Sequence, residues 1–345
     1  KACLVSTTVG TFYDACKDKK YIMSFDEIQL IRMIIAVVAT ALFVAASVIF
    51  LVYLERKVAG HVHRRPGPFE VGPHGMLQTV ADAVKLLSKQ PLKPDGADAV
   101  LFWMAPVAAF TPTLLLLLPI PFGPILTGFE VNLGLLLILA FSGINVLALC
   151  LAGWGSNNKW SLLGAARSVA QAVGYEIPLL LAVLAVTFTS GTLNLSEIVA
   201  RQGPYPWHWN ITTQPLAFFI FFVCALAETN RNPFDLPEAE SELTAGFHTE
   251  YSGMGFGLFF LAEYTNMIVV CSVCTALFLG GWHGPFLPGF WWFLAKMYGL
   301  LLVMMWFRWT FPRLRFDQLL NLNWKWLIPL ALINLMVTAL VMKLF

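Results

Sequence analysis

The chain has 345 residues, of which 58% are hydrophobic and only 12% are charged. Soluble domains carry about 25% charged residues, so the composition excludes a soluble enzyme, a disordered chain and a nucleic-acid-binding protein. The formal net charge of +2 is too small to indicate a polyanionic partner. We therefore expect an all-α, polytopic membrane protein that is surrounded by the lipid bilayer.

Apolar stretches are long enough to form eight transmembrane helices, each of which needs about 20 residues to cross the bilayer core. They are residues 33–54, 99–119, 131–152, 168–190, 211–228, 253–280, 290–307 and 326–344. We divide the chain into an N-terminal extension, residues 1–28, and a single membrane domain, residues 29–345. The extension is not expected to be a cleaved signal, because no small-residue cleavage site follows the first apolar run.

Basic residues are concentrated in four of the segments that connect the predicted spans. These segments are residues 55–98, 153–167, 229–252 and 308–325. Loops rich in Lys and Arg remain on the cytoplasmic side of a membrane. We therefore expect these loops to face the cytoplasm or the mitochondrial matrix, and both termini to lie on the periplasmic or an equivalent side.

The first of these loops contains an amphipathic segment. Residues 76–89 carry apolar side chains at helical spacing with polar side chains between them, which predicts a helix lying on the membrane surface. Such a helix could anchor the loop, or it could form one wall of an entrance for an amphipathic ligand. Glu55, Arg56 and Lys57 close the first span, either as a topology anchor or as a polar triplet that positions a headgroup.

Two carboxyl groups are expected within the membrane. Glu176 lies in the fourth predicted span and Glu263 in the sixth. A carboxyl group at such a depth must be paired, hydrated or protonated. Because ionisable side chains inside membranes usually mark ion or proton pathways, we predict a role in proton transfer; a permanently protonated side chain that only joins two helices is the alternative.

The segment 228–250 has six acidic residues and one basic residue, Arg231. The acids are Glu228, Asp235, Glu238, Glu240, Glu242 and Glu250. Carboxyl groups in such a cluster titrate together, since the charge of one changes the proton affinity of the next. We predict a functional acid cluster; a solvated acidic loop is the alternative.

No segment has a motif for a flavin, a nicotinamide, an iron–sulfur cluster or a metal ion. Cys271 and Cys274 have CxxC spacing, but they lie in an apolar run and are expected to be small packing residues. We therefore predict no metal site, no covalently bound cofactor and no catalytic residue in this chain. In any redox reaction, the electrons would come from a partner protein.

Two stretches of the sequence are distinctive. The first has Glu-Arg-Lys-Val at 55–58, Gly-Pro pairs at 67–68 and 72–73, and Ala-Asp at 81–82; the second is the acidic run 227–246. This pattern resembles one family of membrane subunits of proton-translocating NADH–quinone oxidoreductase (respiratory complex I). Its members are designated H in bacteria and are called NADH dehydrogenase subunit 1 in mitochondria. The resemblance covers roughly residues 30–345.

The resemblance implies a membrane subunit that forms much of a quinone chamber and couples quinone reduction to proton translocation. The implied chamber residues are Glu55, Arg56, Asp82 and Arg231. The implied proton-coupling residues are Tyr175, Glu176, Glu228, Glu238, Glu240, Glu242, Glu250 and Glu263. His63 and Phe69 depart from the family pattern, which usually has Gln and Asn there, so the form of the chamber entrance and the type of quinone stay open.

The resemblance also implies partners and a location. Quinone would be the substrate, while flavin and iron–sulfur clusters would belong to partner subunits. The partners would be the hydrophilic-arm subunits that carry the quinone site and the terminal cluster, together with antiporter-like and small membrane-arm subunits. The protein would lie in a bacterial inner membrane or an organellar energy-converting membrane.

Two alternatives stay open at this point. One is the related membrane anchor of an energy-converting hydrogenase or of a ferredoxin- or F420-linked dehydrogenase. The other is a stand-alone ion transporter, which would be expected to show paired internal repeats.

Overall fold

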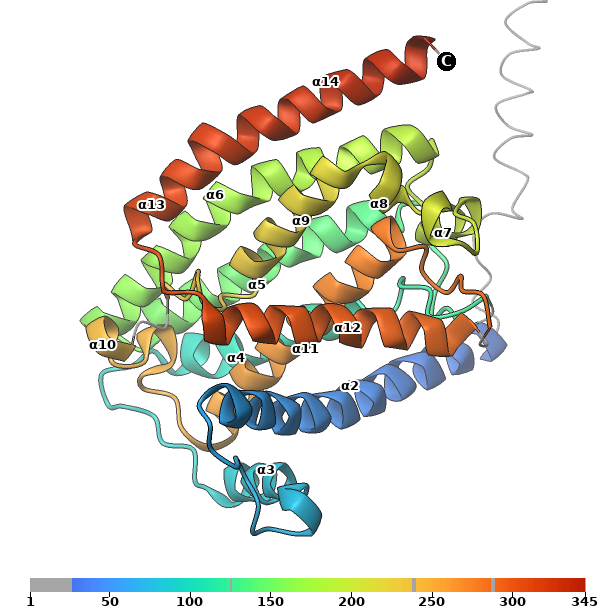
Figure 1. The fold of residues 1–345 in the computed structure, drawn as a ribbon. Coiled ribbons are helices and arrows are strands. Elements are labelled where there is room, and N and C mark those ends of the chain that lie inside the picture. The colour runs from blue at the N-terminus through green and yellow to red at the C-terminus, as the bar shows by residue number, and fades with distance from the viewer. Residues whose placement is uncertain (1–26, 125, 238–239, 287–288, 345) are drawn as a thin grey trace, which may run out of the picture.

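The computed structural model describes residues 27–124, 126–237, 240–286 and 289–344, and the regular elements in these ranges are helices (Figure 1). The longer helices are α2 (Glu27–Val62), α4 (Ala99–Leu115), α5 (Gly134–Gly155), α6 (Lys159–Ser190), α9 (Pro215–Glu228), α11 (Gly253–Phe278), α12 (Gly289–Thr310) and α14 (Ile328–Leu344). The shorter elements are η1 (Pro73–Gly75), α3 (Gln78–Ser88), α7 (Leu195–Arg201), η2 (Pro206–His208), α8 (Asn210–Thr213), α10 (Glu240–Leu243), η3 (Gly246–His248), α13 (Phe316–Asn321) and the π-helical η4 (Leu322–Leu327).

Each of the eight predicted spans corresponds to an apolar helix. Six are long and apolar enough to cross a membrane, with α13, η4 and α14 counted as one continuous helix; α4 and α9 are shorter apolar helices. Helix α4 has 17 residues and is preceded by its N-cap, Asp98, whose carboxylate accepts a hydrogen bond from the backbone N–H of Val100 at 2.9 Å. The 14 residues of α9 begin at Pro215, a residue well suited to the first helical position. The fold is therefore that of an all-α, polytopic membrane protein, as predicted.

Three of the predicted loops are shorter than expected because the neighbouring helices extend into them; helix α2, for example, continues to Val62 in the predicted loop 55–98. Helix α6 begins at Lys159, after Asn158 caps its first turn, so residues 159–167 are helical rather than part of a loop. Only residues 311–315 separate α12 from α13, although the predicted loop was 308–325. Hydropathy places helix ends at the limit of the apolar run, whereas the polar end turns of these helices continue beyond it.

The amphipathic helix predicted over 76–89 is confirmed as α3. Thr79 is buried, whereas Val80, Val84 and Leu87 expose 41%, 59% and 68% of their surface on another side of the helix. The apolar pattern of α3 is therefore not explained by contacts within this chain.

Helix α11 is the most buried of the long helices, and it lies at the centre of the bundle behind α12 (Figure 1). Helix α14 lies beside α6 at one edge, and α2 lies at the opposite edge with α3 beyond its C-terminal end. This arrangement brings the C-terminal parts of α2 and α12 close to the N-terminal half of α11. Glu55, Glu263 and Arg308 lie in this region.

The C-terminal end of α11 is held by Lys296 of α12. Its Nζ donates hydrogen bonds to the backbone carbonyls of Leu279, Gly281 and His283 at 2.5, 3.1 and 2.6 Å. The same ammonium group lies 4.0 Å from the centroid of a Trp209 ring. A positive charge is favourable here because the C-terminus of a helix carries partial negative charge and unpaired carbonyls. The sequence alone did not assign a role to this lysine.

Candidate functional site

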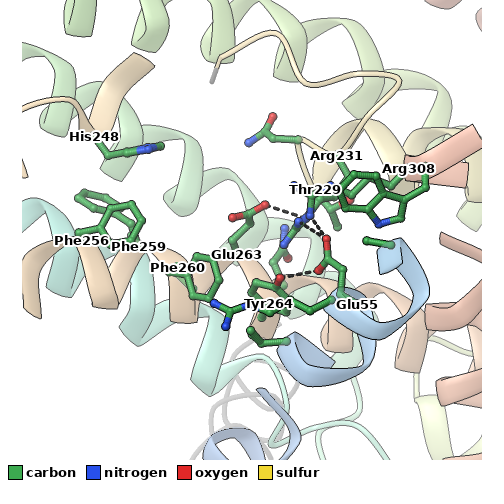
Figure 2. A pocket seen from close by; sticks show the side chains of 18 of the residues that line it. Glu55, Thr229, Arg231, His248, Phe256, Phe259, Phe260, Glu263, Tyr264 and Arg308 are labelled. Carbon is green, nitrogen blue, oxygen red and sulfur yellow. Dashed lines mark hydrogen bonds and ion pairs between the residues drawn. The ribbon is translucent and has the colours of Figure 1, made fainter. Parts of the chain in front are cut away.

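A buried ion network joins α2, α11, α12 and the segment after α9 (Figure 2). Glu55 accepts hydrogen bonds from Arg231 Nη1 at 3.2 Å, from Arg308 and from the Tyr264 hydroxyl. Arg231 Nε lies 2.7 Å from Glu263 Oε1, and the guanidinium carbon lies 4.6 Å from the Tyr264 ring centroid. One guanidinium thus links two carboxylates that belong to different transmembrane helices.

Because this network is buried, the stability of the fold depends on each of its charges having a partner. Glu55 and Arg231 are only 5% and 4% exposed. Removing charges from water is unfavourable, and attraction and hydrogen bonds between the partners offset this only while every partner is present. Arg231 Nη2 is buried and makes no hydrogen bond to any residue that the structure describes.

The network forms one end of a cavity of about 880 Å³, a volume typical of sites for small organic molecules. We call this the charged end, and it consists of Glu55, Arg231, Glu263, Tyr264 and Arg308. The other end, which we call the aromatic end, contains His248, Phe256 and Phe259, and Asn145 also lines the cavity. Figure 2 shows His248, Phe256 and Phe259 on one side and the ion network on the other, with Phe260 between them.

Helix α11 contributes to both ends of this cavity. Phe256, Phe260 and Glu263 follow at spacings of four and three residues, so they lie along one side of the helix. His248 belongs to η3, which precedes α11 by a short turn, and its ring centroid lies 5.3 Å from that of Phe256. The cavity therefore joins an apolar, aromatic compartment to a charged one.

Three of the four predicted chamber residues, Glu55, Arg56 and Arg231, line the cavity, whereas Asp82 is not part of the lining and lies next to it through its ion pair with Arg56. Arg56 lines the cavity and pairs with Asp82 of α3 at 2.5 Å, while Gln78 donates a hydrogen bond to the same carboxylate at 3.2 Å. The Arg56 and Asp82 side chains are 43% and 36% exposed. This ion pair ties the surface helix α3 to the end of α2.

A second group of predicted residues lies where α9 meets α6. Glu228 is the last residue of α9 and lines the cavity. It interacts electrostatically with Glu176 and Tyr175 of α6; Tyr175 is buried and Glu176 is half-buried. This group therefore begins at the cavity and continues along α6.

The remaining described acids of the loop lie outside the cavity lining. The Glu242 side chain is 57% exposed and pairs with Arg167 at 2.6 Å; hydrogen bonding and charge from Arg167 hold the pKa of Glu242 below its usual value. Glu250 accepts a hydrogen bond from Asn158 Nδ2 at 2.5 Å. Glu238 lies outside the described residues, and Glu240 is described only as the first residue of α10.

Sequence reasoning missed several residues of the cavity, namely Asn145, His248, Tyr264 and Arg308. Tyr264 directly follows Glu263, so the helical spacing of α11 could have indicated it. Arg308 was assigned to a basic loop, whereas it lies in the last turn of α12. Within the described part of the chain, no three His, Cys, Asp or Glu side chains are placed so that they could hold a metal ion.

Acidification should destabilise the protein through His248. Burial lowers the pKa of this imidazole to about 4, from an ordinary value of 6.5. Below pH 6.5 the unfolded chain therefore binds a proton that the folded chain does not, and stability is lost as the pH falls from 6.5 towards 4. The loss between pH 7 and pH 5 should be about 2 kcal/mol. Thermal unfolding of the purified protein should be measured at both pH values. His248→Gln should lose less stability between pH 7 and pH 5 than the parental protein, and an equal loss in both proteins would contradict the prediction.

Comparison with known proteins gives a consistent result. Residues 34–339 match the sequence profile of the NADH dehydrogenase family. The chain is 49% identical over 329 residues to the NADH-quinone oxidoreductase subunit designated H of Desulfotalea psychrophila, covering 92% of this chain and 99% of the relative. It is 48% identical over 310 residues to the protein of the same name from Dehalococcoides mccartyi, covering 90% and 86%. It is 46% identical over 338 residues to the corresponding subunit of Geobacter sulfurreducens, designated H 1, covering 92% and 97%.

Proposed function

Because the chain belongs to the NADH dehydrogenase family, we propose that it is the membrane subunit that forms the quinone chamber of an NADH-quinone oxidoreductase. The observation that carries this proposal is the cavity of about 880 Å³ with the Glu55–Arg231–Glu263 network in its wall. A quinone has an apolar body and a polar headgroup, which matches a cavity that is aromatic at one end and charged at the other. The unbonded Arg231 Nη2 can donate to an oxygen atom of the ligand or of an ordered water.

Reduction of a quinone to a quinol takes up two electrons and two protons. The electrons would come from an iron–sulfur cluster in a hydrophilic partner protein of the complex. The residues of this chain would hold the substrate and respond to its change of charge. Because Glu55 and Glu263 share Arg231, a charge arriving near one of them acts on the other through the same guanidinium.

The coupling to proton translocation would begin at the charged end of the cavity. Glu228 lines the cavity and interacts with Tyr175 and Glu176, so it can pass an electrostatic change from the charged end to α6. We propose that Glu238, Glu240, Glu242 and Glu250 extend this acid cluster towards the partner subunits. Antiporter-like subunits of the membrane arm would then receive the perturbation.

From the positive-inside rule we propose that the end of the bundle with α3 and α10 faces the cytoplasm or the matrix. In this orientation the exposed apolar side of α3 would lie in the membrane interface. The Arg56–Asp82 pair would then stand between that interface and the cavity.

The proposal is tested by labelling the assembled complex with a photoreactive azidoquinone. Labelled residues should fall on the cavity-lining parts of α2 and α11, around Glu55 and residues 256–264. Excess decylubiquinone should prevent this labelling. Competable labelling that occurs only outside these segments would contradict the proposed chamber.

A further inference from the structure

Gln171 of α6 carries a buried amide that contacts the segment after α9 at three points. The residue is 0% exposed. Its Nε2 donates to the backbone carbonyl of Ala227 at 2.7 Å, to that of Phe234 at 3.0 Å and to Asn230 Oδ1 at 3.1 Å. Because the amide nitrogen has only two N–H hydrogens, three acceptors converge on them. Gln171 therefore joins α6 to both ends of the segment 227–234.

Arg231 lies in the middle of this segment, where no helix fixes its place. Helix α9 ends at Glu228, and Asn230 has a positive φ of 50°, a value that does not continue a right-handed helix. The segment then turns, since the backbone N–H of Phe234 donates to the Arg231 carbonyl at 2.8 Å. The position of Arg231 therefore depends on contacts between this turn and the neighbouring helices.

Two contacts of this kind hold the residues on either side of Arg231. Asn230 directly precedes it and is bonded to Gln171 of α6. Asn232 directly follows it, and its Nδ2 donates to the backbone carbonyl of Arg308 in α12 at 3.1 Å. Arg231 is thus positioned by one anchor on α6 and one on α12.

The ion network requires a precise position of the Arg231 guanidinium (Figure 2). Its Nε lies 2.7 Å from Glu263 Oε1, and its Nη1 lies 3.2 Å from Glu55 Oε1. Since these carboxylates belong to α11 and α2, a shift towards one lengthens the contact with the other. A donor–acceptor distance of about 3.6 Å is no longer a hydrogen bond, so the contact with Glu55 tolerates a displacement of only about 0.4 Å.

The side of α6 that carries Gln171 also carries a residue of the proposed coupling path. Gln171 and Tyr175 are four residues apart, so their side chains lie on the same side of the helix. Tyr175 interacts electrostatically with Glu228, which directly follows the Ala227 carbonyl bonded to Gln171. One side of α6 therefore faces both the acid at the end of α9 and the segment of Arg231.

From these contacts we infer that Gln171 is a positioning residue that fixes the segment 227–234 and thereby places Arg231 between its two carboxylates. The inference rests on the proposed function and makes it more specific. Gln171 is not part of the cavity lining, so it acts on the charged end through Arg231. The position of Arg231 is then tied to that of α6.

The test is a double-mutant cycle, read as the NADH:decylubiquinone rate of isolated membranes per assembled complex. Gln171→Met keeps nearly the same side-chain length but has no N–H group to donate. Alone it should reduce the rate about three- to tenfold, because small displacements of a positioned group have large effects on rate. In the Arg231→Lys background, where the contact with two carboxylates is already lost, it should reduce the rate less than about twofold.

A second variant covers the case in which Gln171→Met does not assemble. Gln171→Asn keeps the N–H groups but is one methylene shorter, so it reaches fewer of the acceptors. It should give a smaller loss of rate, which should again be reduced in the Arg231→Lys background.

Gln202→Met is a matched control for the loss of a buried glutamine. Gln202 is 3% exposed, and its Nε2 donates to the backbone carbonyls of Ala276 and Leu277 at 2.9 and 3.3 Å. It joins the end of α7 to the last turn of α11 and is not part of the cavity lining. Gln202→Met should leave the rate per assembled complex within about twofold, equally in the parental and Arg231→Lys backgrounds.

The rates and the azidoquinone labels separate two kinds of failure. Three results would overturn this inference alone when competable labelling of the cavity is intact. They are a parental rate in Gln171→Met, equal losses in Gln171→Met and Gln202→Met, and a loss in Gln171→Met that is just as large in the Arg231→Lys background. Absence of any competable cavity labelling would overturn the proposed function, and this inference with it.

Discussion

Replacing Arg231 with Met should lower the free energy of unfolding by about 3–5 kcal/mol and reduce quinone reduction by the complex about tenfold or more. The change leaves Glu55 and Glu263 in a buried site without the guanidinium that contacts both of them. Glu55 is 5% exposed, so water cannot replace the lost partner without rearrangement. Thermal unfolding in detergent and the NADH:decylubiquinone rate of isolated membranes would measure the two effects.

Three further variants make this prediction specific. Arg167→Met removes the exposed ion pair with Glu242 and should cost no more than about 1 kcal/mol. Arg231→Lys keeps the charge but lacks the planar fork that reaches two carboxylates, so it should restore only part of the stability. The double variant Arg231→Met/Glu263→Gln should be more stable than additivity predicts, because it also removes the carboxylate charge that Arg231 compensated, whereas Glu55 keeps its ion pair with Arg308. Equal losses for Arg231→Met and Arg167→Met would show that the network has no special role.

Glu263→Gln should reduce proton translocation about tenfold or more, the usual scale for loss of a positioned proton-transfer group. Glutamine has nearly the same shape and can still contact Arg231, but it cannot take up or release a proton. The measurement is the pH gradient that membrane vesicles build during NADH oxidation, normalised to the amount of assembled complex. Full proton translocation at a parental rate would exclude a proton-transfer role for this carboxyl group.

The matched control for this experiment is Glu197→Gln. Glu197 is an exposed residue in the first turn of α7, and it does not line the cavity. Its replacement should leave translocation within about twofold, since isolated surface charges contribute little. A similar loss in both variants would indicate a general effect of reduced acidic charge rather than a site at Glu263.

Three charged residues of the site, Glu55, Arg231 and Glu263, could be predicted from the sequence, but Arg308 and the pairing of these residues could not. Glu263 was recognisable because a carboxyl group within an apolar span requires a compensating partner. Glu55 and Arg231, however, are 176 residues apart, and helical spacing identifies only neighbours on the same helix. Tertiary packing decides which helix ends meet, so the network with Arg308 and Tyr264 became visible only in the structure.

For the helices too, features set by neighbouring residues could be predicted from the sequence, whereas features set by tertiary packing could not. The spacing of α3 was clear from its own residues, because an amphipathic helix repeats its apolar side locally. The start of α6 at Lys159 was not clear from the sequence, because the first turns of this helix are polar and resemble a loop. The structure shows that Asn158 caps the helix there. His248 and Asn145 were also missed, because neither an isolated histidine nor an isolated asparagine has a pattern that indicates a cavity.

The ammonium group of Lys296 has a consequence for the opposite end of the bundle. Its three hydrogen bonds all go to backbone carbonyls, and an amide carbonyl has no proton to return. These bonds use the ammonium N–H groups as donors and join the end of α11 to the segment that follows it. Lys296 therefore fixes the C-terminal end of α11, while the ion network with Glu263 lies near the N-terminal half of the same helix.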